Sequence, residues 1–573
     1  MVSLLRVLLG GIVPLQAGYA TRWTLDDYLM IQYAQLHDHF HPASVYDMNW
    51  ALTKTMSYPY FLSGLMMTGI PYTLALSVLW VVGALVTTIA MKQIWNHAHD
   101  HDVHWFIWFL IYTFLLFSPV AFDAKSGTRI YRESILPPTV LILVGLFGMW
   151  VLAAVDRYFR RPKALSRQLA WGAVLGTVWS FFWFVKESSI WLAPTFIGTS
   201  LIVLAAGIPG IARCVERRRM KSLIIQIVST LAALAVPLTL FAGGNAVYRA
   251  INQHYYGVPY ASVRTEGEIA GFFERLYRID DPNKTDEYWV PWTTIEMAVA
   301  ASPTLQSQPR LIHQMKVGAF VDGEWGQGPN YDMGVWALMA DLSAVGMFDN
   351  QVQPQRFFAQ VNKELDEADL PQMQGFSPTA LLPRKTAEEI WELRSGFLKT
   401  LRRSVLWSSY SSSLGTSCDS SDTTAMTRCR IMERTLNEPL SHTEKRTMSD
   451  TRDAIGLRVS SIILAAARIL GPVAAIVGAL GLFAACVLLI RDHRNRSARW
   501  RLAAYTVAVA IILMCSMCAL TLAVSWQYVH EPDEIFGYYT GAIVPMTQVI
   551  EVMGVLTLLS IISTHQMPQN KRD

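Results

Sequence analysis

The chain has 573 residues, of which 52% are hydrophobic and only 16% are charged. The mean hydropathy of +0.27 is too high for an ordinary water-soluble protein, which excludes a soluble globular fold for the whole chain. The formal net charge of +4 does not indicate nucleic-acid binding, because the basic residues gather in a few connections between apolar segments. The composition therefore predicts an all-α polytopic membrane protein.

About ten apolar segments approach the roughly 20 residues that a membrane-spanning helix needs. In chain order they are residues 7–20, 72–91, 105–122, 135–155, 169–185, 190–212, 222–241, 469–490, 502–526 and 541–562. We therefore expect about ten transmembrane helices. The first segment is short and ends in Gly18-Tyr19-Ala20, a small-x-small pattern typical of signal-peptidase sites, so it is either an uncleaved helix or a cleaved leader.

Clusters of basic residues alternate along the chain between these segments. They lie at residues 157–167, 213–221, 491–501 and 571–572. Because positively charged connections stay on the cytoplasmic side, ten spans place both termini and all these clusters inside. The stretches that then face outward are 21–71, 123–134, 186–189, 242–458 and 527–540. We expect a multi-pass protein of a bacterial cytoplasmic membrane whose chemistry faces outside, although a protein of the endoplasmic reticulum would show the same pattern.

The longest outward-facing stretch is polar enough to fold in water, and its apolar residues recur mainly at helical spacing. We expect a transmembrane core at 1–241 with a first outer loop at 21–71, an extracytoplasmic mainly helical domain at 242–458, and C-terminal transmembrane helices at 459–573. The sequence shows no internal repeat.

Cys418 and Cys429 are the only cysteines in the outward-facing stretches, where they flank part of a Ser/Thr-rich segment. An oxidising exterior favours a disulfide between them. The alternative is a pair of free thiols in a loop, and either way their role is structural.

Asp26 and Asp27 stand side by side in TRWTLDDYLM, just after the first apolar segment. One interpretation is an acidic start to an interfacial helix, since carboxylates stabilise helix N-termini. The second is a reactive site. Adjacent carboxylates raise each other's pKa, and a carboxylate within hydrogen-bond reach of a hydroxyl can take its proton.

An acidic pair on the outer side, directly after the first span, resembles the GT-C superfamily of glycosyltransferases. These polytopic enzymes transfer a sugar from a polyprenyl-phosphate-type donor to an acceptor on the exoplasmic face. The resemblance implies that Asp26 or Asp27 acts as a base or positions the acceptor. It covers residues 1–240, where Lys54 before the Tyr-Pro-Tyr-Phe-Leu run adds to it. The outer domain departs from the family, because it precedes the last three spans instead of following all of them.

Cations on the same side suit the phosphate leaving group. Arg129, Arg132 and Lys186 are the candidates, since arginine binds phosphate through two parallel hydrogen bonds. The alternative is that they extend to lipid headgroups from helix ends. Glu187 is expected to pair with an arginine, or with Lys186 as a surface ion pair.

Metal binding has weaker signals. His37, His39 and His41 lie in the loop that follows the acidic pair, and some GT-C enzymes need a divalent metal ion. On a strand the three imidazoles would share a face, but on a helix they would not. A metal site is therefore not predicted, although a divalent ion is a candidate cofactor.

Two further features carry polar chemistry. In the outer domain, Trp325 and Trp336 are flanked by carboxylates (Asp322, Glu324 and Asp332), a composition that suits sugar stacking or, alternatively, a domain core. Glu551 falls near the middle of the last span, where a carboxylate costs roughly 2–3 kcal/mol to insert unless it is paired or protonated. It should face the interior of the helix bundle.

The leading hypothesis is a glycosyltransferase that uses a polyprenyl-phosphate-linked sugar and a glycan, lipid or protein acceptor, within membrane lipids and without nucleic acid. A glycan polymerase or ligase of the O-antigen type is the second hypothesis, because it also combines about ten spans with a long outer loop. A transporter or flippase of envelope precursors, with Glu551 as its coupling group, is the third. A purely structural envelope protein is the fourth.

Overall fold

The computed structural model describes most of the chain. The described residues are 1–17, 26–35, 52–99, 102–158, 163–318, 328–329, 331–415, 417–418, 422–442, 448–493, 497–528 and 538–565. Apart from one parallel pairing of two-residue strands, β1 (Ser417–Cys418) and β2 (Ser441–His442), the secondary structure there is helical. The predicted all-α class is confirmed.

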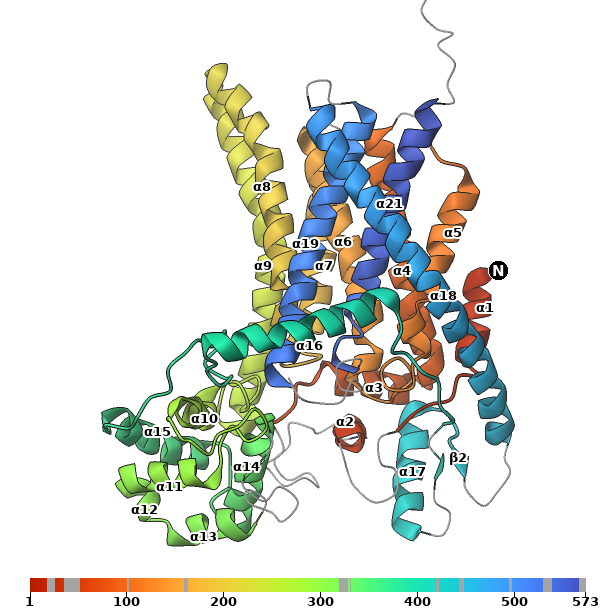
Figure 1. The fold of residues 1–573 in the computed structure, drawn as a ribbon. Coiled ribbons are helices and arrows are strands. Elements are labelled where there is room, and N and C mark those ends of the chain that lie inside the picture. Colours follow the sequence, from red (N-terminus) through yellow and green to blue (C-terminus); the bar gives the residue numbers. More distant parts are fainter. Residues whose placement is uncertain are drawn as a thin grey trace, which may run out of the picture.

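Within the described residues, seven helices are long and apolar enough to cross a membrane. They are α4 (Tyr72–Ala98), α6 (Leu136–Tyr158), α8 (Ala193–Glu216), α9 (Met220–Tyr256), α18 (Met448–Arg491), α19 (Ala498–Gln527) and α21 (Ile543–His565). They run side by side in one bundle (Figure 1). The protein is therefore a multi-pass membrane protein.

The expected count of about ten spans is not confirmed among the described residues, where two of the expected segments form short helices. The first, α1 (Val2–Gly10), has 9 residues, or about 14 Å at 1.5 Å per residue, against a hydrocarbon core of about 30 Å. The second, α5 (Trp105–Leu116), has 12 residues. It ends before Pro119, which cannot continue a helix, and a 3₁₀ turn follows, η2 (Pro119–Phe122).

A third expected span, α7 (Ala164–Trp183), has the length to cross, with 20 residues. Its first turns carry Ser166, Arg167 and Gln168, which make it less apolar than the other seven. It packs inside the bundle between α6 and α9.

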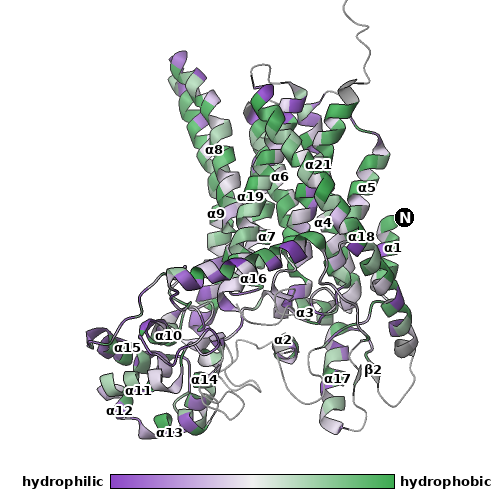
Figure 2. Ribbon diagram, in the orientation of Figure 1, coloured by the Kyte–Doolittle hydropathy of each residue, from purple (hydrophilic) through white to green (hydrophobic). Residues whose placement is uncertain are grey.

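The stretch predicted as one outer domain, residues 242–458, contains three separate helical parts. A compact helical unit comes first, with α10 (Gly267–Arg278), α11 (Trp292–Ala301), α12 (Pro303–Gln306), α13 (Pro309–Val317), α14 (Gly334–Ala344) and α15 (Val352–Glu367). Its own core is separate from that of the bundle and includes Phe272, Phe273 and Phe358. The helix α16 (Ala387–Leu406) then lies across the bundle, and α17 (Thr423–Leu436) stands beyond it (Figure 1). Hydrophilic residues are concentrated on the unit and on α16, whereas the bundle is mainly hydrophobic (Figure 2).

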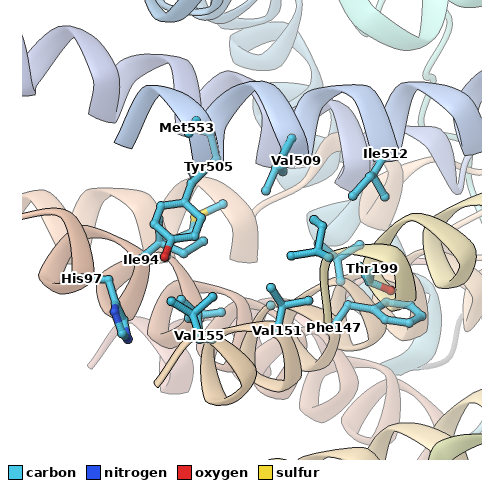
Figure 3. Close-up of a pocket in the computed structure, with 18 of the residues that line it drawn as sticks. Ile94, His97, Phe147, Val151, Val155, Thr199, Tyr505, Val509, Ile512 and Met553 are labelled. Carbon is cyan, nitrogen blue, oxygen red and sulfur yellow. The ribbon is translucent and has the colours of Figure 1, made fainter. Parts of the chain in front are cut away.

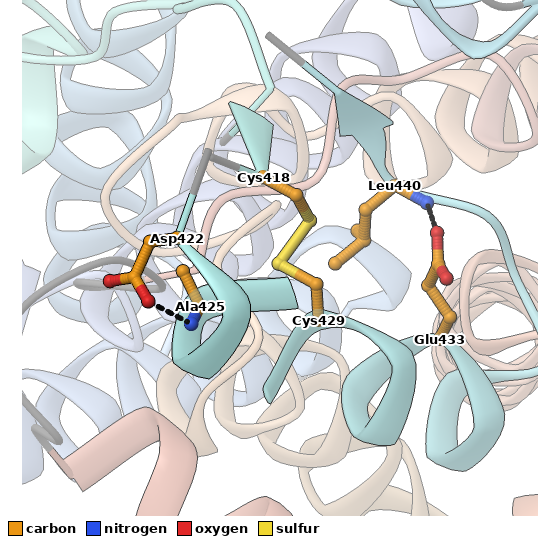
Figure 4. The surroundings of a disulfide bond; sticks show 6 residues. All are labelled: Cys418, Asp422, Ala425, Cys429, Glu433 and Leu440. Atoms are coloured by element: carbon orange, nitrogen blue, oxygen red, sulfur yellow. Dashed lines mark hydrogen bonds between the residues drawn. A yellow bond between two sulfur atoms is a disulfide. The ribbon is translucent and has the colours of Figure 1, made fainter. Parts of the chain in front are cut away.

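A disulfide between Cys418 of β1 and Cys429 of α17 joins this strand to the helix (Figure 4). Asp422 caps its first turn by accepting from Thr424 N at 2.7 Å, and Glu433 accepts from Leu440 N at 2.8 Å. The disulfide predicted from the sequence is therefore present, and it fixes the strand β1 to the helix.

The α17 helix packs against two short helices of the first outer loop, α2 (Asp26–Gln35) and α3 (Ser57–Thr68). Gln35 Nε2 donates to Ile431 O at 3.3 Å, and Asn437 Nδ2 donates to Leu65 O at 2.7 Å. The first bond ties α2, which carries the acidic pair, to α17, and the second ties α3 to the residue that follows α17.

Candidate functional site

A cluster of charged residues lies where several outer segments meet, at the side of the bundle predicted to face outward. Its members come from α2, from the 3₁₀ turn η3 (Arg132–Ser134) and the loop before it, and from the turn between α7 and η4 (Ser189–Leu192). The segment just before α21, the segment just before α3 and the outer helical unit add further side chains. The cluster consists of the charged residues Asp27, Lys54, Arg129, Arg132, Glu133, Lys186, Glu187, Arg264 and Asp332, together with Tyr538, which contacts two of them. We call it the outer charged site.

The first ion pair of the site joins Asp27 to Arg129. Arg129 Nε donates to Asp27 Oδ2 at 2.8 Å, and Arg129 Nη2 donates to Asp27 Oδ1 at 2.7 Å. Asp27 is only 1% exposed. The loop that carries Arg129 is held by Gln16, whose N–H donates to Thr128 O at 3.0 Å and whose carbonyl accepts from Ile130 N at 2.7 Å. Asp27 is thus buried against a bidentate cation.

The second pair joins Arg132 to Glu187. Arg132 Nη1 lies 2.9 and 2.8 Å from the two carboxylate oxygens, and Arg132 Nη2 donates to the Tyr131 hydroxyl at 2.7 Å. Thr55 N also donates to Glu187 Oε1 at 3.1 Å. Burial alone would raise the pKa of Glu187, but the positive charges of Arg132, Lys54 and Arg264 lower it to about 2. Glu187 therefore stays ionised, and the expected pairing of Glu187 with an arginine is observed.

The third pair joins Lys186 to Glu133. Lys186 Nζ lies 2.7 Å from Glu133 Oε1, and the Tyr538 hydroxyl donates to the other oxygen of Glu133 at 3.0 Å. Lys186 Nζ also stands 4.0 Å from the centroid of the Tyr539 ring. Burial lowers the pKa of Lys186, although the charge of Glu133 opposes this shift. Lys186 therefore lies buried against Glu133 and does not extend into solvent.

The outer helical unit supplies one wall of the site. Lys54 Nζ lies 5.0 Å from the Trp336 ring centroid, and the Arg264 guanidinium lies 5.8 Å from the same ring. Such distances allow cation–π attraction. Arg264 also forms an ion pair with Asp332. Trp336, predicted as an acceptor-stacking or core residue, is therefore partly exposed beside two cations.

Aromatic rings continue from the ion pairs toward the outer unit. Arg129 lies 5.0 Å from the Tyr131 ring and 4.8 Å from the Tyr538 ring. Tyr539 stacks on Tyr528 at 5.2 Å between centroids, and Tyr528 meets Tyr331 of the outer unit at 5.2 Å. These side chains form an aromatic wall that links the membrane part of the site to the outer unit.

Sequence reasoning missed several members of the site. Glu133 stands directly after Arg132, but nothing in the sequence shows that it would pair with Lys186. Tyr538 and Tyr539 follow a polar outer loop, and an interfacial aromatic belt gives the same sequence pattern. Arg264 lies in a polar stretch without any motif. The alternation of basic and acidic residues at 129–133 and 186–187 is the one signal that could have indicated paired charges.

The remaining predicted residues lie elsewhere or outside the described residues. Asp26 begins α2, but its side chain is outside the described part, as are His37, His39, His41 and the 319–327 segment with Trp325. Among the described residues no group of three or more His, Cys, Asp or Glu side chains could hold a metal ion.

Glu551 lies apart from the outer charged site, on α21 against α18. It is 4% exposed, and neither of its carboxylate oxygens has a hydrogen-bond partner within the described part of the chain. A Cβ atom on Gly478 would come within 2.8 Å of the Glu551 Cα atom, so the glycine allows the close approach of the two helices. The carboxyl group faces the bundle interior, as expected for an intramembrane acid.

No protein-family model, curated protein or solved structure matches this chain.

Proposed function

We propose that this protein is a membrane glycosyltransferase, which transfers a sugar from a polyprenyl-phosphate-type donor to an acceptor at the outer face of a bacterial cytoplasmic membrane. The observation that carries the proposal is the convergence of Asp27, Arg129, Arg132 and Lys186 in one buried cluster at the membrane boundary. Buried ion pairs contribute little net stability, because desolvation offsets their attraction. Three such pairs in one place therefore favour a functional role.

In the proposed reaction the donor phosphate competes with the carboxylates for the cations. The fork of Arg129 that holds Asp27 has the geometry that also fits two phosphate oxygens. When phosphate takes this place, Asp27 is released beside the reacting centre and can accept the proton of the acceptor hydroxyl. Arg132 and Lys186 then stabilise the negative charge that develops on the leaving phosphate.

The acceptor approaches from the outer unit in this proposal. Trp336, Tyr331 and Tyr528 offer partly exposed rings, and Asp332 offers a carboxylate beside them. Flat apolar ring faces next to hydrogen-bond acceptors suit the alternating apolar and hydroxyl surfaces of a sugar. A saccharide acceptor is therefore the class that we favour over a protein or lipid.

The test compares cells that carry the wild-type protein with cells that carry Asp27→Asn or Arg129→Gln, at equal membrane abundance. Polyprenyl-linked sugars and surface glycans are profiled by mass spectrometry. We expect both variants to lose one glycan and to accumulate one lipid-linked sugar. Asp349→Asn, an exposed acid on the outer unit, is the matched control and should leave both profiles unchanged. Unchanged profiles in both site variants would refute the proposal.

One observation favours a second candidate, a transporter or flippase of envelope precursors. The buried Glu551 carboxyl, without a hydrogen-bond partner among the described residues, is the kind of group that couples proton movement to transport. In that case Glu551→Gln would abolish precursor translocation, while Asp27→Asn would leave the chemical composition of the lipid-linked pool unchanged.

A further inference from the structure

The bundle contains a cavity of about 660 Å³ between α4, α6, α8, α19 and α21. Its walls are mainly apolar and include Phe147, Val151, Tyr505, Val509 and Met553, which Figure 3 shows around one open space. The lining comes from the halves of α4, α6 and α19 that lie away from the outer charged site. The cavity is therefore a separate feature on the side that carries the basic connections.

The cavity arises because α8 diverges from α19. The two helices meet near the outer side, where Thr195 Oγ1 and Ser516 Oγ lie 2.8 Å apart and Thr195 N donates to Ser516 Oγ at 3.1 Å. Toward the other side the α8–α9 hairpin leans away from the bundle (Figure 1). There Ile202 and Pro209 of α8 line the cavity without closing it.

Polar groups lie at the inner end of this cavity. Arg501, near the start of α19, lines it and donates through Nη2 to Ala98 O at 2.9 Å. Its Nε atom is buried without a hydrogen-bond partner among the described residues. His97 also lines the cavity, and its Nε2 lies 3.0 Å from Asp156 Oδ1, which neighbours Arg167. Arg501 and Arg167 together carry two positive charges, and Asp156 carries one negative charge. This end of the cavity is therefore positively charged whether or not His97 is protonated.

We propose that this cavity binds an anionic phospholipid, with a hydrocarbon chain between α6, α8 and α19 and with its phosphate at Arg501. Apolar walls at membrane depth favour hydrocarbon over any water-soluble ligand. Basic pockets between transmembrane helices on the cytoplasmic side recognise anionic headgroups. The charge at the mouth thus selects an anionic lipid over a zwitterionic one.

The lipid is distinct from the sugar donor of the proposed reaction. Arg501 is at one end of α19, which has 30 residues and is therefore about 45 Å long. The outer charged site lies at the other end of the bundle. A phosphate at Arg501 cannot at the same time contact Arg129 or Lys186, so this lipid is not the donor positioned for the proposed reaction.

Native mass spectrometry of the full-length protein in detergent tests this proposal, with phosphatidylglycerol and phosphatidylcholine as probes. We expect one phosphatidylglycerol molecule to be retained. Arg501→Gln should lower the preference for phosphatidylglycerol by about fivefold, whereas Arg499→Gln, two residues away and outside the cavity lining, should not. Ala508→Phe, which places a ring in the cavity, should abolish retention of both lipids, whereas Ile511→Phe on the exposed face of α19 should not.

A second measurement keeps the test valid if Ala508→Phe does not fold. A phosphatidylglycerol with a diazirine on its acyl chain is photolysed with the wild-type protein, and the labelled peptides are identified. Labels on the peptides of Tyr505 and Met553 would support the site. Equal retention of the two lipids, labels confined to other helices, or a co-purified polyprenyl phosphate in place of the phospholipid would overturn it.

Discussion

Arg129 donates hydrogen bonds to both carboxylate oxygens of Asp27, although 102 positions separate the two residues in the chain. The pair joins the first outer loop to the loop between α5 and α6. Because Asp27 is almost fully buried, the guanidinium of Arg129 provides opposite charge where water is largely excluded. The same two residues therefore form a buried ion pair and carry the proposed chemistry. Their effects on stability and on activity can be measured by replacing each residue separately.

Arg129→Met should destabilise the protein by about 3 kcal/mol, because it leaves a buried carboxylate without its cation. The double variant Asp27→Leu/Arg129→Met should recover most of this loss, since neither charge then remains. Thermal unfolding in detergent measures both. A double variant that is less stable than Arg129→Met would show that the pair is not the reason for the loss.

Loss of the disulfide should loosen α2. Cys429→Ser removes the bond that closes the segment between positions 418 and 429, at a cost of about 2–3 kcal/mol for a loop of this length. Because α17 packs on α2 through Gln35, amide hydrogen exchange in α2 should accelerate more than exchange in α10. Cys214→Ser, which changes a free cysteine of α8, is the control and should change neither. If amide exchange in α2 stays at the wild-type rate, the disulfide does not stabilise the helix that carries Asp27, and the prediction is wrong.

Glu187 should make stability depend on acid pH. Its pKa falls from an ordinary 4.5 to about 2 in the folded protein, because Arg132, Lys54 and Arg264 outweigh the opposite effect of burial. A lowered folded pKa stabilises the protein above the unfolded pKa, and this contribution is lost as the pH falls from about 4.5 to about 2. Thermal unfolding between pH 7 and pH 2 should show a smaller acid-induced loss for Glu187→Gln than for the wild type. Glu388→Gln, at an exposed position of α16, should behave like the wild type.

Close packing of α18 on α21 should not tolerate a side chain at Gly554. A Cβ atom there would overlap the backbone of Gly478, and neither helix backbone can move without separating the pair. Gly554→Val should therefore destabilise the protein by about 3 kcal/mol or prevent its folding. Gly64→Ala, where a Cβ atom meets nothing within 4 Å, is the control. Size-exclusion profiles and melting temperatures of the purified variants provide the measurement.

The sequence predicts some parts of this fold well, for definite physical reasons. Long apolar runs such as the one in α4 become helices because the membrane leaves a backbone few other ways to satisfy its hydrogen bonds. The number of spans is harder to predict from the sequence. The α5 helix is apolar throughout, but it ends at Leu116, and a 3₁₀ turn begins at Pro119. Hydropathy alone does not distinguish a helix that crosses the membrane from one that stops within it.

The sequence likewise predicts some residues of the site but not how they pair. Charged residues in outer loops were predicted as candidates individually, the cations because they suit a phosphate and the acids because a carboxylate can act as a base. Which acid pairs with which base depends on how the loops fold over one another, and Glu133 with Lys186 could not be derived from spacing. The three predicted phosphate ligands each turn out to hold a carboxylate, which changes the proposed mechanism from an open cation site to an exchange of partners.

The α9 helix has a consequence for how the outer unit is held. It runs unbroken for 37 residues from Met220 to Tyr256, and Tyr256 belongs to the core of the outer unit. Asn252 and Arg249 fasten the same end through hydrogen bonds to Tyr260 O and Glu266. The α9 helix thus couples the position of the outer unit to the tilt of a helix embedded in lipid, and tilt responds to the thickness of the bilayer. In thinner membranes a more inclined α9 would carry Trp336 and Arg264 to a new position relative to Lys54, so lipid composition becomes a determinant of the geometry of the site.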